Sequence, residues 1–154
     1  MSFMAQSLAN ILVHLVFSTK DRLPFLVDQG LREGLHRYLG GIINEQGGQS
    51  LSVGGVSDHV HILCAMSKNV SAADFVRDLK RASSAWVKQQ PSGAENFAWQ
   101  AGYGIFSVGQ TEIAMMQGYI GNQEEHHRTL TFQEEYRAFL MKYGVPYDER
   151  YVWA

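Results

Sequence analysis

The alternation of apolar and polar positions divides the chain into short extended runs and longer amphipathic segments. Runs rich in β-branched and aromatic residues are typical of strands, and they cover residues 10–19, 49–56, 58–66 and 103–108. Apolar residues at helical spacing, with capping or helix-ending residues at their boundaries, predict helices over residues 28–46, 71–90, 110–127 and 131–143. The predicted order of elements is therefore β-α-β-β-α-β-α-α.

The first six of these elements match a ferredoxin-like, or split βαβ, arrangement. We therefore predict an α+β fold in which two helices cover one face of an antiparallel four-stranded sheet, followed by a helix that carries Tyr119 and by one further C-terminal helix. The first and third strands are central in this topology. The pair Gly54-Gly55 predicts a bulge or bend at the end of the second strand. Because no linker or low-complexity segment interrupts the chain, residues 1–154 are expected to form a single domain.

Composition excludes several classes of protein without changing this fold. No apolar run approaches the length of a membrane-spanning helix, and the N-terminal residues carry no basic segment of the kind that begins a signal peptide, so a cytoplasmic protein is expected. One cysteine, Cys64, excludes an internal disulfide and a cysteine-based zinc site. The formal net charge of -2 argues against a bulk nucleic-acid binder. Any nucleic-acid surface must then be a local patch.

The candidate chemistry begins with His59 and His61 in the predicted third strand. Side chains alternate between the two faces of a strand, so both imidazoles point the same way and could hold one metal ion. Tyr119 and Gln123 are four residues apart and share one face of the predicted helix over residues 110–127. A helix laid against the sheet would bring a phenol and an amide oxygen towards the imidazoles. Nitrogen and oxygen ligands without a thiolate suit Mg²⁺, Mn²⁺ or a similar divalent ion.

Each of these features has a commonplace explanation when it is taken alone. A His-x-His pair on a strand is more often structural or part of another kind of metal site, and a lone tyrosine is usually a packed aromatic residue. His126 and His127 could reach the site from the end of their helix, but a solvated helix end is the simpler expectation. His14 and His36 are expected to be packing or surface residues, and Cys64 faces the core opposite the histidine pair.

Taken together, the motifs resemble those of a known family. His59-Val60-His61 is similar to the histidine-hydrophobe-histidine motif of the HUH nucleases. Tyr119 with Gln123 resembles the tyrosine helix of the single-tyrosine HUH transposases, which mobilise insertion sequences as single-stranded DNA. The resemblance spans nearly the whole chain, from the first strand to residue 127.

The resemblance implies a mechanism. Tyr119 would attack a scissile phosphate and form a 5′-phosphotyrosine, leaving a free 3′-hydroxyl, while His59, His61 and Gln123 hold the divalent ion. No nucleotide cofactor is needed, because one phosphodiester is exchanged for another. The resemblance also implies a homodimer in which the tyrosine helix of one subunit can serve the histidines of the other. Gly118 and Gly121 would loosen that helix or let it pack closely.

The implied partner is single-stranded DNA with hairpins formed by subterminal palindromes. Basic side chains lie in the loop after the first strand and along the outer face of the predicted helix over residues 71–90, although a polar outer face is common to soluble helices. Phosphate contacts from such side chains would supply affinity. The predicted DNA-binding residues are Lys20, Arg22, Arg77, Lys80, Arg81 and Lys88. Most acidic residues are expected elsewhere, at Glu124, Glu125, Glu134, Glu135, Asp148 and Glu149.

We therefore predict a metal-dependent, single-tyrosine DNA transposase that cleaves and rejoins single-stranded ends. Two alternatives stay open. One is a domesticated relative that nicks and joins chromosomal repeat hairpins without moving itself. The other is a non-catalytic module that binds single-stranded nucleic acid on a ferredoxin-like sheet. The combination of His59, His61 and Tyr119 speaks against the second, because a pure binder has no need of all three.

Overall fold

The computed structural model describes residues 5–154 and is built on a four-stranded antiparallel sheet. Residues 1–4, on which part of the signal-peptide prediction rests, lie outside the described residues. The strands pair in the order β2-β3-β1-β4, which places β1 and β3 in the centre as predicted for the ferredoxin-like arrangement. Their bounds are β1 (Ile11–Ser18), β2 (Gln49–Val56), β3 (His59–Met66) and β4 (Gly104–Ser107).

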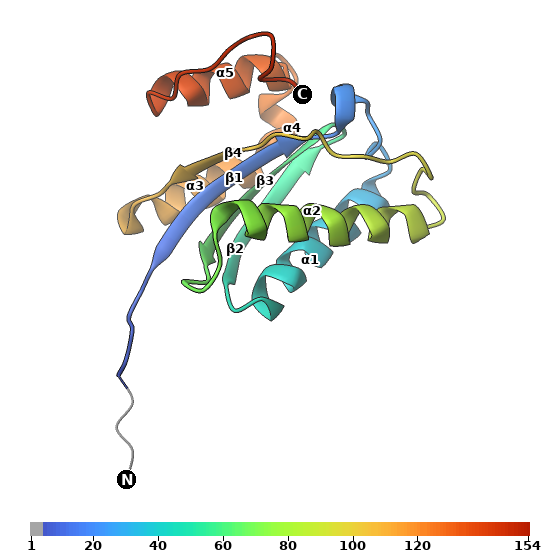
Figure 1. The fold of residues 1–154 in the computed structure, drawn as a ribbon. Helices are drawn as coiled ribbons and strands as arrows, with labels where there is room; N and C mark the ends of the chain where they lie inside the picture. The colour runs from blue at the N-terminus through green and yellow to red at the C-terminus, as the bar shows by residue number, and fades with distance from the viewer. Residues whose placement is uncertain (1–4) are drawn as a thin grey trace.

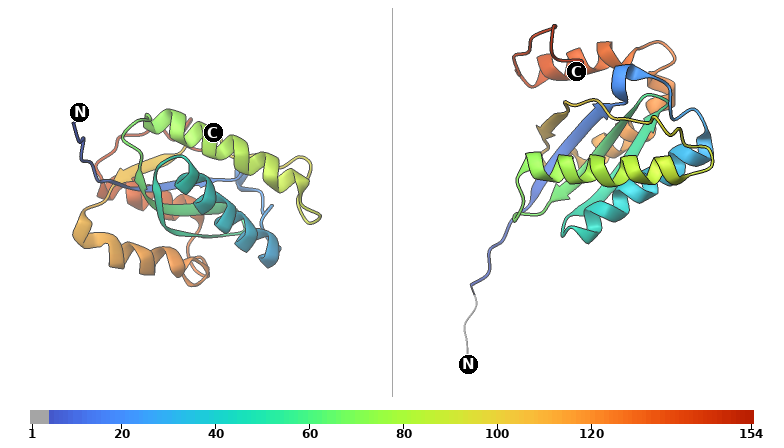
Figure 2. Two further views of the ribbon diagram at one scale, coloured as in Figure 1. Left: turned by 90° about the horizontal axis from the view of Figure 1, so that it is seen from below. Right: turned by 45° about the vertical axis from the view of Figure 1, so that its right-hand side comes forward.

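Two long helices, α1 (Gln29–Glu45) and α2 (Ala72–Gln89), cover one face of the sheet, as Figures 1 and 2 show. Each begins at the predicted N-cap, because the side chains of Asp28 and Ser71 accept hydrogen bonds from backbone N–H groups in the first turn. The largest apolar core lies between these helices and the sheet and includes Cys64, on the face opposite the histidine pair as predicted. Within residues 5–154, no helix combines the length and apolarity needed to cross a membrane.

The opposite face carries the remaining helical segments: η2 (Gln110–Glu112), α3 (Ile113–Gly121), α4 (Gln123–His126) and α5 (Phe132–Lys142). The prediction of one continuous helix over residues 110–127 is wrong, because the helix breaks at Asn122, whose φ of -108° and ψ of 25° are not helical. The preceding Gly121 favours such a break, since glycine is a poor helix former. A Cβ at Gly118 or Gly121 would meet open space, so neither glycine is there for close packing.

Helix α5 begins with the predicted capping box, in which Thr131 and Glu134 each satisfy a backbone N–H group of the other. Its apolar side chains pack with Val16 of β1 and Phe106 of β4, while α3 packs across β2 and β3. In Figure 1, α5 (red) therefore lies over one side of this face and α3 (light orange) over the other. The histidines of β3 lie between them.

The predicted bulge at Gly54-Gly55 is also wrong. Both glycines pair in regular register with β3, and the irregularity of β2 falls between Ser50 and Ser52. Gly54 has a different role, because a Cβ there would lie 2.5 Å from the carbonyl oxygen of Ile120. The missing side chain lets α3 approach the sheet closely.

A third short helical segment, η1 (Lys20–Arg22), follows β1 where the sequence predicts a break. Asp21 and Arg22 both adopt the left-handed conformation, with φ values of 56° and 55°. The turn places Arg22 beside the C-terminal segment, where its guanidinium donates a hydrogen bond to the carbonyl of Trp153.

Candidate functional site

The structure brings together the four residues predicted to form the site. His59 and His61 project from β3 towards α3 and α5, and both are buried. Gln123 follows the break after α3, and its Oε1 lies 3.1 Å from Nε2 of His59. The ring of Tyr119, on α3, lies edge-on to the ring of His61 with the centroids 5.9 Å apart. One chain supplies all four groups.

Glu135 on α5 lies in the middle of this group, although the sequence predicted only that it lies away from the DNA-binding residues. Its Oε1 is 2.8 Å from Nε2 of His61 and 3.4 Å from Nε2 of His59. Its Oε2 accepts hydrogen bonds from the hydroxyl of Tyr119 and from the amide nitrogen of Gln123. Only 1% of the side chain is exposed. The sequence prediction gave Glu135 no role in this site.

A signal for Glu135 exists in the sequence. Phe132 and Phe139 lie three residues before it and four residues after it, so all three side chains fall on one face of α5. A carboxylate on an apolar helix face needs a buried partner, because burying an unpaired charge is costly.

His127 also belongs to the site, so its expected place at a solvated helix end is wrong. Its Nε2 lies 3.1 Å from Oε1 of Gln123 and 3.2 Å from Oε1 of Glu135. Its Nδ1 lies 2.6 Å from the carbonyl oxygen of Leu130. The break at Asn122 turns the chain so that this histidine faces inward rather than continuing along α3.

Two further residues orient the histidines of β3. Oδ1 of Asp58 lies 2.7 Å from Nδ1 of His59, an arrangement that fixes the ring and leaves Nε2 facing the site. Nε2 of His14, on β1, lies 2.8 Å from Nδ1 of His61, and the two rings stack. His14 was expected to be a packing or surface residue, and it is a fully buried packing residue that contacts the site directly.

The electrostatics of the site are set by burial and by the shared carboxylate. Burial alone would lower the pKa of His59, but hydrogen bonds with Asp58 and Glu135 outweigh it and raise the pKa to about 9. Burial lowers the pKa of His61 to about 4 despite the neighbouring carboxylate. Burial would raise the pKa of Glu135, but its three imidazole neighbours hold it well below its usual range. Burial, and then Glu135, raise the pKa of the Tyr119 hydroxyl.

The donor atoms fit a divalent metal ion. One ligand atom from each of His59, His61, His127 and Glu135 lies within 4.8 Å of all the others. Oε1 of Gln123 faces the same space, 3.1 Å from two of these imidazoles. Imidazole nitrogen, carboxylate oxygen and amide oxygen are common ligands of divalent ions in proteins. The described residues therefore provide the types of ligand atom that the predicted metal site needs.

A groove of about 860 Å³ opens beside the site and reaches Asp58 and His127. Arg22, Arg32 and Arg128 line it together with the acidic residues Asp58 and Glu124, and Arg32 is paired with Glu124. A polyanionic strand entering here would reach the edge of the histidine cluster.

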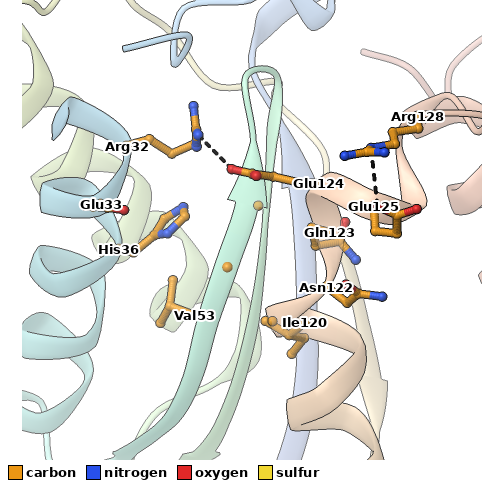
Figure 3. Close-up of a pocket in the computed structure, with 13 residues that line it drawn as sticks. Arg32, Glu33, His36, Val53, Ile120, Asn122, Gln123, Glu124, Glu125 and Arg128 are labelled. Carbon is orange, nitrogen blue, oxygen red and sulfur yellow. Dashed lines mark hydrogen bonds and ion pairs between the residues drawn. The ribbon is translucent and has the colours of Figure 1, made fainter. Parts of the chain in front are cut away.

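A second pocket, of about 370 Å³, lies between α1 and the α3–α4 break (Figure 3). His36 extends into it from α1, and Gln123 and Asn122 line the opposite side. Arg32 of α1 crosses to Glu124 of α4 at 3.0 Å. This ion pair links the α1 layer to the segment that carries Gln123.

The predicted DNA-binding residues fall into two separate regions. Arg22 lines the groove beside the site, and Lys20 is exposed in the same turn. Another groove, of about 390 Å³, lies on the opposite side of the sheet, beside Tyr103 and Trp99. The four predicted residues of α2 line that groove: Arg77, Lys80, Arg81 and Lys88. The structure does not bring these four together with the histidine cluster.

Two residues of α2 are already engaged within the chain. Nζ of Lys80 donates hydrogen bonds to the carbonyl oxygens of Gln100 and Gly102, at 2.7 and 2.6 Å, and burial lowers its pKa to about 8. Arg77 pairs with Asp74 and with its neighbour along the helix, Asp78. Their ammonium and guanidinium groups are less open to a partner than the sequence suggested.

A split βαβ sheet with a buried His-x-His pair, and a tyrosine on a helix that packs over that pair, is the arrangement of the HUH class of proteins. The family described as IS200-like transposases matches residues 7–123, and the chain belongs to it, and so to the single-tyrosine HUH transposases. The ISDra2 transposase TnpA of Deinococcus radiodurans is 29% identical over 119 residues, which are 73% of this chain and 83% of that protein.

Two solved structures have a similar fold. A crystal structure of a candidate transposase from Deinococcus radiodurans R1 has a TM-score of 0.57 and 28% identity, covering 80% of this chain and 98% of that one. The structure of a REP-associated tyrosine transposase bound to a REP hairpin has a TM-score of 0.54 and 12% identity, covering 79% of this chain and 72% of that one. At this identity the second likeness concerns the fold alone.

Proposed function

We propose that this protein is a metal-dependent DNA transposase that cleaves and rejoins single-stranded DNA at hairpin-marked ends through a 5′-phosphotyrosine intermediate. The observation that carries the proposal is the position of the Tyr119 hydroxyl, which lies against a buried cluster containing His59, His61 and Gln123. Membership of the IS200-like transposases supports the same chemistry.

In the cleavage step, Oη of Tyr119 attacks the scissile phosphorus and forms a P–O bond to the 5′ side of the strand. Its proton passes to Oε2 of Glu135, to which the hydroxyl already donates a hydrogen bond. The bond from phosphorus to the 3′-oxygen breaks, and the departing oxygen takes up one proton from water to become a free 3′-hydroxyl. When bound, a divalent ion supplies polarisation of the phosphate and stabilises charge on the departing oxygen.

The rejoining step runs the same chemistry in reverse with a different 3′-hydroxyl. That hydroxyl attacks the phosphotyrosine and gives up its proton to water, and the phenolate of Tyr119 leaves and recovers its proton from Glu135. A phenol with an ordinary pKa near 10 is a competent leaving group for this step. Because one phosphodiester replaces another, no nucleotide cofactor is required.

For the metal, we propose that His59, His61 and Gln123 are the ligands and that Mg²⁺ or Mn²⁺ is the ion. The tautomer of His59 supports this role. Its Nδ1 faces the Asp58 carboxylate, so once metal binding has displaced the proton that the raised pKa retains, the ring presents an unprotonated Nε2 towards the site.

The proposed partner is single-stranded DNA that carries hairpins. The groove lined by Arg22, Arg32 and Arg128 supports entry of a strand beside the cluster, and exposed Lys20 extends the positive surface. The α2 residues Arg77, Lys80, Arg81 and Lys88 would contact DNA at a distance from the scissile bond, on the other side of the sheet. We further propose that residues 1–154 act as one nuclease domain and that the protein works as a homodimer, in which subunits can exchange their tyrosine helices.

A second candidate function is the processing of chromosomal repeat hairpins by a domesticated relative. The fold likeness to a tyrosine transposase bound to a REP hairpin favours this candidate. The same residues would carry out the same chemistry. Paired subterminal palindromes in the DNA flanking the gene would favour the mobile element instead.

The decisive experiment mixes purified protein with 3′-labelled single-stranded oligonucleotides that carry hairpins from the DNA flanking the gene, in Mg²⁺ or Mn²⁺. We expect a covalent protein–DNA adduct on a denaturing gel, absent after chelation and absent in Tyr119→Phe. Tyr143→Phe is a matched control, because Tyr143 stacks on Phe106 away from the cluster, and it should form the adduct normally. An adduct in Tyr119→Phe would overturn the assignment of the nucleophile.

A further inference from the structure

Resting on the proposed metal-dependent function, we infer that His127 and Glu135 are additional ligands of the metal centre. The segment after the family-matched residues 7–123 would then complete a site with five protein donors. The donor set points to a first-row transition-metal ion, such as Mn²⁺, in preference to Mg²⁺.

The hydrogen bonding of His127 fixes which of its ring nitrogens can bind a metal. Nδ1 lies 2.6 Å from the carbonyl oxygen of Leu130, which can only accept a hydrogen bond, so Nδ1 carries the hydrogen. In the neutral ring, Nε2 then carries no hydrogen and presents a lone pair. It faces Oε1 of Gln123 and Oε1 of Glu135, at 3.1 and 3.2 Å, and both of these atoms are also acceptors.

His59 repeats this pattern. The Asp58 carboxylate engages its Nδ1, and its Nε2 lies 3.1 Å from Oε1 of Gln123 and 3.4 Å from Oε1 of Glu135. The amide of Gln123 is correctly oriented, since its Nε2 donates to the carboxylate of Glu135. With both rings neutral, lone pairs on two nitrogens and two oxygens therefore converge, and a metal cation placed among them makes every contact favourable, taking the place of the protons that the imidazoles hold in the metal-free protein.

The spacing of the donors suits a metal ion in that position. Neighbouring ligands of a six-coordinate ion with bonds of about 2.1 Å lie about 3 Å apart. Five contacts within the cluster measure between 2.8 and 3.4 Å. Five protein ligands would leave one position of such an ion for a phosphate oxygen.

The chemistry of the donors selects the class of ion. Three of them are imidazole nitrogens, which suit first-row transition metals. Mg²⁺ prefers oxygen ligands and usually retains several waters, so a largely dehydrated, nitrogen-rich site disfavours it. A site formed by His59, His61 and Gln123 alone would have fewer nitrogen ligands, so its preference for a transition-metal ion over Mg²⁺ would be weaker.

The position of Glu135 supports a ligand role over a purely structural one. Its Oε1 faces the imidazoles while its Oε2 accepts from Tyr119, so one carboxylate joins the metal ligands to the nucleophile. On α5 it is buried on the same helix face as Phe132 and Phe139. A hydrophobic residue there would pack without needing buried partners.

The test measures the binding of metal ions to the full-length protein after any bound metal has been removed. It does not depend on DNA cleavage. Mn²⁺ and Mg²⁺ are titrated calorimetrically, and Co²⁺ by its visible absorption bands. We expect Glu135→Gln and His127→Gln each to weaken Mn²⁺ binding at least about 10-fold and to alter the Co²⁺ bands. Wild-type protein should bind Mn²⁺ more tightly than Mg²⁺.

Two matched variants serve as controls. Glu134→Gln changes the neighbouring residue of α5, where glutamine can also complete the capping box, and should bind Mn²⁺ like the wild type. His36→Gln removes a histidine outside the cluster and should do the same. If Glu135→Gln does not fold, as judged by circular dichroism, His127→Gln decides the outcome.

Unchanged Mn²⁺ affinity and unchanged Co²⁺ bands in both cluster variants would overturn the inference. Equal affinity of the wild type for Mg²⁺ and Mn²⁺ would overturn the class of ion. Neither result affects the proposed function if the wild type still forms a DNA adduct that Tyr119→Phe lacks. Conversely, loss of metal affinity in the cluster variants without any adduct in the wild type would support the site and reject the transposase chemistry.

Discussion

The hydroxyl of Tyr119 on α3 donates a hydrogen bond to the carboxylate of Glu135 on α5, sixteen residues further along the chain. The same carboxylate contacts the imidazoles of His59, His61 and His127. The group proposed to attack DNA and the groups proposed to hold the metal are therefore coupled through one buried side chain.

Replacing Glu135 with alanine should destabilise the metal-free protein. The three imidazoles would lose the buried anion that they share, and removing one partner of a buried charged pair costs about 3 kcal/mol. The free energy of unfolding, measured by urea denaturation at pH 7 with a chelator, checks this expectation. Glu134→Gln should change it little, and a loss below about 1 kcal/mol in Glu135→Ala would contradict the structure.

Asp58→Asn should weaken metal binding while the protein stays folded. The asparagine amide can donate to Nδ1 of His59 and so place the ring hydrogen on Nε2, where it would block the metal. We expect Mn²⁺ affinity to fall by about 10- to 100-fold in calorimetry. Asp28→Asn is the matched control, because asparagine is an equally good N-cap for α1. Equal affinities for the two variants would count against the orienting role of Asp58.

Gly54→Ala should disturb the site from a distance. The new Cβ would lie 2.5 Å from the carbonyl oxygen of Ile120, so α3 must shift and carry Tyr119 away from the histidines. We expect the unfolding free energy to fall by about 2 kcal/mol and adduct formation to drop. Gly118→Ala, where the Cβ meets open space, should instead preserve stability or raise it by up to about 1 kcal/mol. The prediction fails if both variants behave alike.

His36 should make stability depend on pH. Burial, with Arg32 adding to it, lowers the pKa of His36 from 6.5 to about 4 in the folded protein. Below pH 6.5 the unfolded chain binds a proton that the folded protein resists, so stability should fall between pH 6.5 and 4, by up to about 3 kcal/mol. Urea unfolding at several pH values should show a shallower fall in His36→Gln. Parallel curves for the two proteins would show that His36 does not contribute.

The two basic regions make separable predictions for DNA binding. Arg128→Gln, in the groove beside the cluster, should weaken binding of a single-stranded hairpin. It should also reduce the slope of log affinity against log salt concentration by about one, because about one counterion fewer is released on binding. Lys88→Gln tests the opposite side of the sheet in the same assay. Fluorescence anisotropy at several salt concentrations provides the measurement. A larger effect of Lys88→Gln would place the main DNA contact on α2.

Local patterns predicted the strands and the helix caps, because each depends on residues close together in the sequence. The strand order followed from the order of elements, which matches the ferredoxin-like arrangement. The period-two alternation of β3 also placed His59 and His61 on one face, since a strand reverses its side chains at each step. The break at Asn122 escaped prediction. The residues just beyond it, Gln123, Glu124 and Glu125, are good helix formers, so they give no sign that the helix is interrupted at Asn122.

Glu135 and His127 were missed for a different reason. Their roles depend on how α5 packs over β1 and β4, which no local pattern reports. A glutamate next to a capping box and a histidine near a helix end both look like ordinary surface residues. The apolar neighbours Phe132 and Phe139 were the available sign that Glu135 faces inward.

The break at Asn122 has a mechanical consequence. Tyr119 belongs to α3, whereas Gln123 and His127 belong to the segment beyond the break, and α3 is joined to that segment through a single non-helical residue. Rotation about the backbone of Asn122 would change the separation of Tyr119 from Gln123 and His127, two of the proposed metal ligands, without unwinding either helix. Asn122 could therefore act as a hinge between α3, which would carry a covalently attached DNA end on Tyr119, and the following segment, which would stay with the metal.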